Sequence, residues 1–181
     1  EDIAAPACFE IERRLDEQLD TPVFHDDQWG TAVITLAGIL NYSRLCGRPL
    51  SALRCVINGA GAAGIRIADM LAEAGAGPIL MCDSKGVLRE DRADLNAMKR
   101  RYAARTSCRT LEAALRGAHV FIGVSAAGCL KPGWLRAMEP YPAIFAMANP
   151  DPEIRPEETA AALAGKPYVM ATGRSDTPNQ I

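Results

Sequence analysis

The motif with the clearest chemistry in this sequence is a glycine-rich turn. It consists of Gly59, Ala60, Gly61, Ala62, Ala63 and Gly64, which fit the pattern G-x-G-x-x-G, and Asp83 follows nineteen positions after Gly64. The turn comes directly after a predicted strand and opens a predicted helix, whose N-terminus offers backbone N–H groups to a phosphate. The motif therefore predicts a dinucleotide site in which Asp83 accepts hydrogen bonds from the adenosine ribose.

Each part of this motif also has a simpler interpretation. The glycines could merely allow a tight strand-to-helix turn in a protein that binds no dinucleotide. Asp83 could cap a turn at the end of its strand. The adjacent Ser84 and Lys85 could serve a 2′-phosphate, which leaves the choice between NAD and NADP open.

Two pairs of acids form a second candidate site. Glu1 and Asp2 begin the chain, and Asp26 and Asp27 follow one predicted helix later. Carboxylate oxygens are the ligands that Mg²⁺ and Mn²⁺ prefer, so converging acids would suit a divalent cation. The alternative is that these acids are solvated in loops, with Asp26 or Asp27 capping the apolar helix that follows.

Three further residues, Ser125, His25 and His119, have side chains that could take part in chemistry. Ser125 follows a predicted strand on the side where open α/β sheets bind ligands, so it is a candidate cofactor contact or simply a loop residue. His25 and His119 cannot be paired with a serine or cysteine motif, which leaves a nucleophilic triad unsupported. We expect His25 to orient the neighbouring acids and His119 to be structural.

The elements that position these residues follow an alternating order. Amphipathic spacing predicts a helix over residues 8–19, and an apolar run predicts a buried helix over 30–45. Strands are expected at 53–58, 79–82, 119–122, 143–146 and 168–170. Helices are expected from the glycine-rich turn through residue 74 and at 110–116, 132–138 and 156–164. This order predicts a doubly wound, Rossmann-like α/β fold with a parallel sheet. We expect residues 1–50 to carry the metal-site loops and helices and residues 51–181 to form the cofactor domain.

Composition narrows the class of protein. The 181 residues carry a formal net charge of −2, which gives no basic face for nucleic acid or an anionic membrane. The apolar runs are far shorter than a bilayer span. Six cysteines without a C-x-x-C pair favour reduced thiols and a cytoplasmic location. The start at Glu1 and the stop at Ile181 suggest a chain that is cut at both ends.

Six motifs in the same order resemble those of the bacterial malic enzymes. They are Glu-Asp-Ile-x-Ala-Pro-x-Cys-Phe at 1–9, Pro-Val-Phe-His-Asp-Asp-Gln-x-Gly-Thr-Ala at 22–32, Asn-Gly-Ala-Gly-Ala-Ala-Gly at 58–64, Phe-Ile-Gly-Val-Ser at 121–125, Ala-Asn-Pro-Asp-Pro-Glu-Ile at 148–154 and Ala-Thr-Gly-Arg-Ser-Asp at 171–176. The resemblance covers essentially the whole chain.

The resemblance implies a set of roles. Glu1, Asp2 and Asp27 match the family's carboxylates for Mg²⁺ or Mn²⁺, Asp26 is the neighbouring acid of that catalytic site, and Asn149 matches an asparagine that lines the nicotinamide and substrate pocket. The implied reaction is oxidative decarboxylation of malate to pyruvate and carbon dioxide with NAD or NADP. There, the cation stabilises the charge that develops on the C2 oxygen. A homo-oligomeric full-length protein is also implied.

Two departures from the family pattern bear on activity. Trp29 stands where bacterial relatives usually have histidine, and no residue matches the family's catalytic tyrosine, its lysine or its Asn-Asn pair. We therefore expect this chain alone to be inactive. The competing hypotheses are another dehydrogenase on the same fold and a nucleotide-binding module without catalysis.

Overall fold

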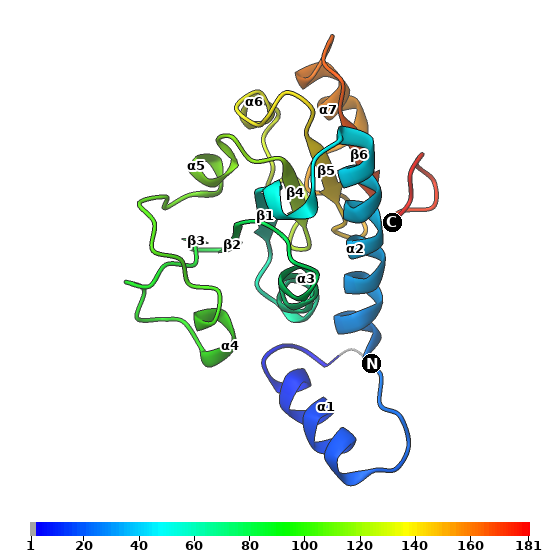
Figure 1. Cartoon of the computed structure of the whole chain (residues 1–181), viewed down its shortest axis with the longest axis vertical. Coiled ribbons are helices and arrows are strands. Elements are labelled where there is room, and N and C mark those ends of the chain that lie inside the picture. The colour runs from blue at the N-terminus through cyan, green and yellow to red at the C-terminus, as the bar shows by residue number, and fades with distance from the viewer. Residues whose placement is uncertain (1–2) are drawn as a thin grey trace.

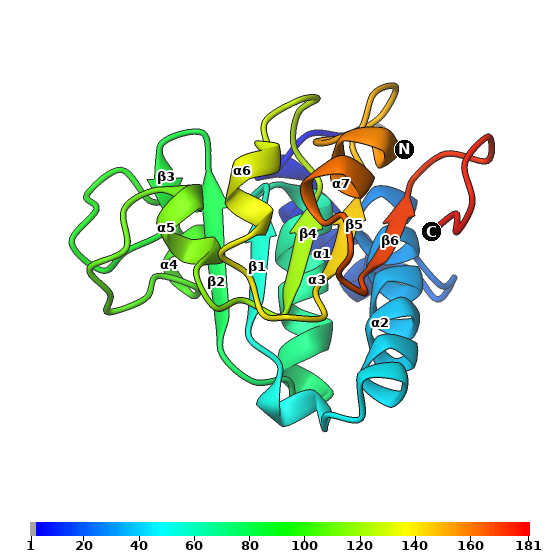
Figure 2. The ribbon, with the colours of Figure 1, turned by 90° about the horizontal axis from the view of Figure 1, so that it is seen from above.

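The computed structural model describes residues 3–181, and its centre is a six-stranded sheet with strand order β3-β2-β1-β4-β5-β6. The strands are β1 (Cys55–Asn58), β2 (Ile79–Asp83), β3 (Gly86–Val87), β4 (Val120–Gly123), β5 (Ala143–Ala146) and β6 (Val169–Thr172). All neighbours pair in parallel except β2 and β3, which are antiparallel. The predicted doubly wound α/β fold is confirmed (Figures 1 and 2).

The strand order creates a switch point beside β1. The chain passes from β1 to β2 on one side, and then returns to place β4 on the other side of β1. In open parallel sheets, ligands bind in the crevice beyond the carboxyl ends of the strands at such a point. The glycine-rich turn follows β1, and Ser125 follows β4, so both lie at this edge of the sheet.

Helices cover both faces of the sheet and enclose two separate cores. The helices are α1 (Ala7–Gln18), α2 (Asp26–Cys46), α3 (Ala62–Glu73), α4 (Ala97–Arg100), α5 (Leu111–Leu115), α6 (Pro132–Leu135) and α7 (Pro156–Ala162), with a 3₁₀ turn at Leu50–Ala52. Alternate strand residues enter different cores, as expected of a pleated sheet. Ile57 packs with α2 and α3, whereas Val56 packs with α5 and α6.

The predicted first residues of the helices and strands agree with the structure in some elements and differ in others. The strand at 143–146 coincides with β5, but α2 begins at Asp26, four residues before the predicted start at Gly30. His25 consequently occupies the N-cap position, and both aspartates lie in the first turn, where negative charge is stabilising. Strand β3 and helix α4 were not predicted, because two and four residues are too few to show a period.

The helix that was predicted to be buried, α2, is buried on part of its surface only. Ile39 and Tyr42 are buried, but Val33, Ile34 and Leu45 are 48%, 45% and 66% exposed. The helix packs mainly against α3, and its buried residues also approach the segment around β5, where the Tyr42 hydroxyl donates to the Tyr141 carbonyl oxygen. An apolar run shows that a helix prefers burial, but the number of its neighbours depends on tertiary structure.

Two expectations about the class of protein can be compared with the described residues. Across residues 3–181, no helix combines the length and apolarity needed to cross a membrane. All six cysteines lie within this range, and each is a free thiol.

Candidate functional site

The glycine-rich turn is shaped by two close backbone approaches. Gly59 has a φ of +125°, and a Cβ there would overlap the carbonyl oxygen of Val124 in the loop after β4. A Cβ on Gly64 would overlap the carbonyl oxygen of Gly59. These two glycines therefore let the turn fold back on itself and pack against its neighbouring strand.

Gly61 differs from them because it faces open space. A Cβ at this position would meet no protein atom within 4 Å. Gly61 is the N-cap of α3, and no side chain of the described residues caps this helix. The unpaired N–H groups of the first turn can therefore point to a ligand, and the helix dipole favours one that carries negative charge.

Two cavities meet at this turn. The first, which we call the Asn149 cavity, has a volume of about 570 Å³ and the second, the Asp83 cavity, about 560 Å³. Both are lined by Gly61 and Ser125, so a single extended ligand can enter both while it passes over the N-terminus of α3. Volumes of several hundred Å³ are typical of small-molecule and cofactor sites.

The predicted cofactor residues divide between these cavities. Gly59, Ala60 and Asp83 line the Asp83 cavity, while Ala62, Ala63 and Asn149 line the Asn149 cavity. Gly64 lines neither, because it lies behind the turn.

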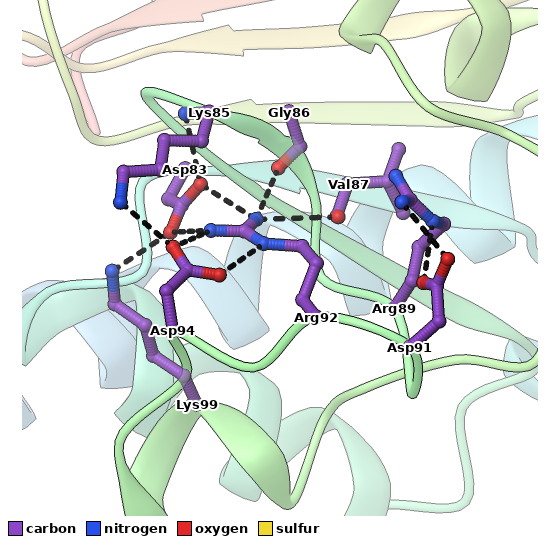
Figure 3. A network of polar contacts seen from close by, with 9 residues as sticks. All are labelled: Asp83, Lys85, Gly86, Val87, Arg89, Asp91, Arg92, Asp94 and Lys99. Atoms are coloured by element: carbon purple, nitrogen blue, oxygen red, sulfur yellow. Dashed lines mark hydrogen bonds and ion pairs between the residues drawn. The ribbon is translucent and has the colours of Figure 1, made fainter.

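Asp83 is held by a network of basic side chains (Figure 3). Its Oδ1 accepts hydrogen bonds from Arg92 Nη1 at 2.9 Å and from the Lys85 backbone N–H at 3.0 Å. Its Oδ2 accepts from Arg92 Nη2 at 3.1 Å and from Lys99 Nζ at 2.8 Å. A carboxylate has about four lone-pair sites, so these donors leave little capacity for ribose hydroxyls.

A second acid completes this network. Asp94 accepts hydrogen bonds from Arg92 Nη2 at 2.8 Å and from Lys85 Nζ at 2.9 Å. Three cations thus surround two carboxylates, which leaves a net positive charge beside the Asp83 cavity. Ser84 and Lys99 line the cavity itself. Sequence reasoning missed Arg92, because it lies in an irregular loop without a motif.

The network shifts the pKa of Asp83. Burial alone would raise it, but the hydrogen bonds from Arg92 and Lys99 outweigh burial and lower the pKa from 3.8 to about 2. A carboxyl group whose pKa is lowered on folding stabilises the folded protein at a pH above its pKa in the unfolded chain. This stabilisation is lost as the pH falls through the pKa of the group in the folded protein.

We therefore predict that Asp83→Asn lowers the free energy of unfolding by about 2 kcal/mol above pH 4. The difference from the unmodified protein should shrink between pH 4 and pH 2, as measured by urea unfolding at several pH values. Asp20→Asn, at an exposed position just after α1, is the matched control. A difference that stays constant down to pH 2 would contradict the assignment.

The loops after β4 and β5 supply the polar groups of the Asn149 cavity. The side chains of Ser125 and Asn149 line it from these two loops. Asn58, the last residue of β1, donates from its side-chain amide to Ser125 Oγ at 2.7 Å. Asn58 was not singled out from the sequence, although its position directly before the glycine-rich turn was a usable signal.

Asp27, on the first turn of α2, also lines the Asn149 cavity. Its Oδ2 lies 3.4 Å from Nε2 of the buried His25. His25 Nδ1 lies 2.9 Å from the side-chain amide of Gln28, so the imidazole is held from its other edge. His25 was expected to orient the acidic pair, and the structure shows its contact with one member of that pair, Asp27.

The other predicted acids are placed differently. Asp26 is exposed, lines neither cavity and turns along its own helix toward Gly30. Glu1 and Asp2 lie outside the described residues. Within residues 3–181, no three histidine, cysteine or acidic side chains gather closely enough to hold a metal.

Trp29 is directed away from the Asn149 cavity. Its Nε1 donates to Glu12 Oε1 at 2.6 Å, and the Arg66 guanidinium lies 4.5 Å from the ring centroid. Arg66 also donates to Glu12 Oε2 at 3.0 Å. The indole therefore ties α1 and α3 to α2 and does not crowd Asp27.

Comparison with known proteins agrees with this geometry. The family described as "Malic enzyme, NAD binding domain" matches residues 29–180. The NADP-dependent malic enzyme of Rhizobium meliloti is 51% identical to the whole chain, which covers 24% of that relative. The bifunctional malic/malolactic enzyme of Bacillus subtilis is 48% identical, with the whole chain covering 45% of it.

A solved structure gives the same result. The NAD-dependent malic enzyme of Thermotoga maritima is 44% identical and superposes with a TM-score of 0.93, over 99% of this chain and 48% of that one. The chain thus spans less than half of each of these three relatives. The match over residues 29–180 shows that the chain belongs to the malic enzyme family, as part of its NAD-binding domain.

Proposed function

We propose that this chain is the cofactor-binding part of an enzyme that oxidatively decarboxylates malate to pyruvate and carbon dioxide with NAD or NADP. The observation that carries the proposal is the meeting of two cavities at Gly61 and Ser125, beyond the carboxyl ends of β1 and β4. The names of the relatives supply the substrate, since each is called a malic enzyme or a malic/malolactic enzyme.

In this proposal the cofactor lies across both cavities. The adenosine half enters the Asp83 cavity, the pyrophosphate lies over Gly61 at the N-terminus of α3, and the nicotinamide enters the Asn149 cavity. Two observations support NADP over NAD. The donors of Arg92, Lys85 and Lys99 already occupy the acceptor sites of Asp83, and Ser84 and Lys99 line the cavity where a 2′-phosphate would lie.

Malate would lie between the nicotinamide and the wall that carries Asp27. Asn149 and Ser125 can donate or accept hydrogen bonds there, and thereby orient the nicotinamide against the C2 hydrogen that leaves as hydride. The walls formed by Val124 and Met147 contribute apolar surface, which limits the access of water.

The proposal includes a divalent cation, Mg²⁺ or Mn²⁺, held by Asp27 together with Glu1 and Asp2, with Asp26 as the neighbouring acid. Its support from the described residues is one carboxylate, Asp27, on the wall of the substrate cavity. One or two carboxylates with waters and substrate oxygens are a common donor set for Mg²⁺. A cation bound there would supply Lewis-acid stabilisation of the developing negative charge on the substrate oxygen.

A chimera tests the proposed reaction. This chain would replace the matching segment of the Rhizobium meliloti enzyme, to which it is 51% identical over its whole length. We expect the chimera to reduce NADP in the presence of malate and Mn²⁺, and to release pyruvate in equal amount. A folded chimera that binds NADP but turns over no malate would contradict the proposal, because the supplied segments would be competent and only this chain would differ.

A further inference from the structure

Glu153 is the most deeply buried carboxylate of the described residues, with no exposed surface. It lies between β5 and α7, in the segment that the sequence analysis singled out for Asn149 alone. Neither the adenosine site nor the pyrophosphate site uses it. Its position next to the Asn149 cavity raises the question of what a buried acid does there.

The carboxylate joins the two loops that form this cavity. Oε1 accepts a hydrogen bond from the Ser125 backbone N–H at 3.0 Å, and Oε2 accepts one from the Ala148 backbone N–H at 3.0 Å. Ser125 is two residues past the end of β4, and Ala148 is two residues past the end of β5. One side chain therefore sets the spacing of the two loops.

The surroundings are shaped to accept this carboxylate. Gly123, the last residue of β4, has no side chain, and a Cβ there would lie 2.6 Å and 2.7 Å from the two carboxylate oxygens of Glu153. Among the described residues Glu153 has no ion-pair partner. Burial outweighs the hydrogen bonds from the two backbone N–H groups, so the pKa of Glu153 lies above its ordinary value.

We call Glu153 and the two backbone N–H groups that it accepts from, those of Ser125 and Ala148, the Glu153 clamp. This clamp requires a hydrogen-bond acceptor at both ends of the carboxylate. An ionised carboxylate has only acceptors, and here each oxygen meets an N–H donor. A glutamine would offer one acceptor and one NH₂ group, and the NH₂ group would face a donor at either Ser125 or Ala148. A buried carboxylate without a cation is costly, and an apolar residue would fill the same space without that cost.

We propose that Glu153 is a positioning residue for the nicotinamide half of the cofactor, because it fixes the distance between the loops that present Ser125 and Asn149. The carboxamide of the nicotinamide would then lie in the cavity that both residues line. This inference rests on the proposed cofactor function, and it adds a specific role for the nicotinamide end.

A pair of matched ligands tests this role. ADP-ribose and its 2′-phosphate are NAD and NADP without the nicotinamide, so they report on the rest of the cofactor alone. For Glu153→Gln, calorimetry should show at least a tenfold rise in the dissociation constant of the dinucleotide that binds better. The dissociation constant of the matching ligand without nicotinamide should change less than twofold.

Two further variants separate positioning from folding. Glu158→Gln is the control, because this exposed glutamate also accepts from a backbone N–H, at Arg155, but lies outside both cavities. Gly123→Ala disturbs the same clamp by placing a methyl group against the Glu153 carboxylate. It should also weaken binding of the dinucleotide and leave binding of the ligand without nicotinamide unchanged. The double variant Gly123→Ala with Glu153→Gln should bind the dinucleotide no more weakly than the single variant with the higher dissociation constant, because both changes disrupt the same clamp.

The outcomes distinguish the two proposals. If the unmodified chain binds neither the dinucleotides nor the ligands without nicotinamide, the cofactor function itself fails. If it binds them, but Glu153→Gln and Gly123→Ala weaken both ligand types equally or weaken neither, the positioning role fails alone. Should Glu153→Gln not fold, the ligand comparison on Gly123→Ala decides the question.

Discussion

Gly61→Val should remove dinucleotide binding while the protein stays folded. The residue has a φ of −96°, which valine adopts readily, and its Cβ would meet no protein atom within 4 Å. The new methyl groups would instead occupy the space in front of the first turn of α3, where we place the pyrophosphate. We expect the dissociation constants of NAD and NADP to rise at least 100-fold in calorimetry.

A second glycine of the same turn provides the contrast. Gly64→Ala places a methyl group onto the carbonyl oxygen of Gly59, so this variant should lose about 1–3 kcal/mol of stability. Thermal unfolding should therefore separate the two variants, with a clear loss only for Gly64→Ala. Normal cofactor affinity in folded Gly61→Val protein would show that the pyrophosphate lies elsewhere.

Asp27→Asn should nearly abolish malate oxidation in the chimera with the Rhizobium meliloti enzyme. Asparagine keeps the size of the side chain but removes the charge that would hold the cation on the wall of the Asn149 cavity. A bound cation contributes several kcal/mol to the stabilisation of developing charge, so we expect a fall of about 100-fold or more in kcat/KM for malate.

The Mn²⁺ dependence and the NADP affinity of the Asp27→Asn chimera show whether the loss of rate is caused by weaker metal binding. The Mn²⁺ concentration needed for half-maximal rate should rise, while the dissociation constant of NADP should remain the same, because Asp27 lies on α2, outside the glycine-rich turn, and does not line the Asp83 cavity. Asp20→Asn, which removes an equal charge from an exposed position near α1, should leave the rate unchanged. A fully active Asp27→Asn chimera would remove Asp27 from the metal site.

Local patterns were enough to predict the centre of the fold. The apolar segment before Gly59, the glycine spacing and the alternation of strands and helices are all encoded within short windows. They predicted a doubly wound α/β fold with a dinucleotide site at the turn after the strand that ends at Asn58, whereas the strand order is known only from the structure. Ser125 was a candidate because it follows a predicted strand, and Asn149 was a candidate because of the family resemblance; the structure shows that both line one cavity.

The environment of Asp83 could not be predicted in this way. Arg92 and Lys99 lie nine and sixteen residues further along the chain, in a segment with only a two-residue strand, a four-residue helix and no motif. Their contact with Asp83 depends on the path of that segment across the end of β2 (Figure 3). The sequence consequently predicted a free ribose acceptor, whereas the structure has a carboxylate that is already paired.

The role of Glu153 could not be predicted from the sequence either. In the sequence it is one of 22 acidic residues, and its neighbours give no sign that it is buried. The evidence for its role is the missing Cβ of Gly123, thirty positions earlier, and two backbone donors from different loops. Such a combination becomes visible only when strands β4 and β5 lie side by side.

The most direct test of the central claim is an NMR titration of the isotope-labelled chain with NADP and NAD. We predict saturable binding of one cofactor per chain, with NADP tighter. The largest amide shifts should fall at Gly61 and Ser84 on one side of the turn and at Ser125 and Asn149 on the other. The account would be contradicted by a folded chain that binds neither cofactor, or by shifts that lie away from the two cavities.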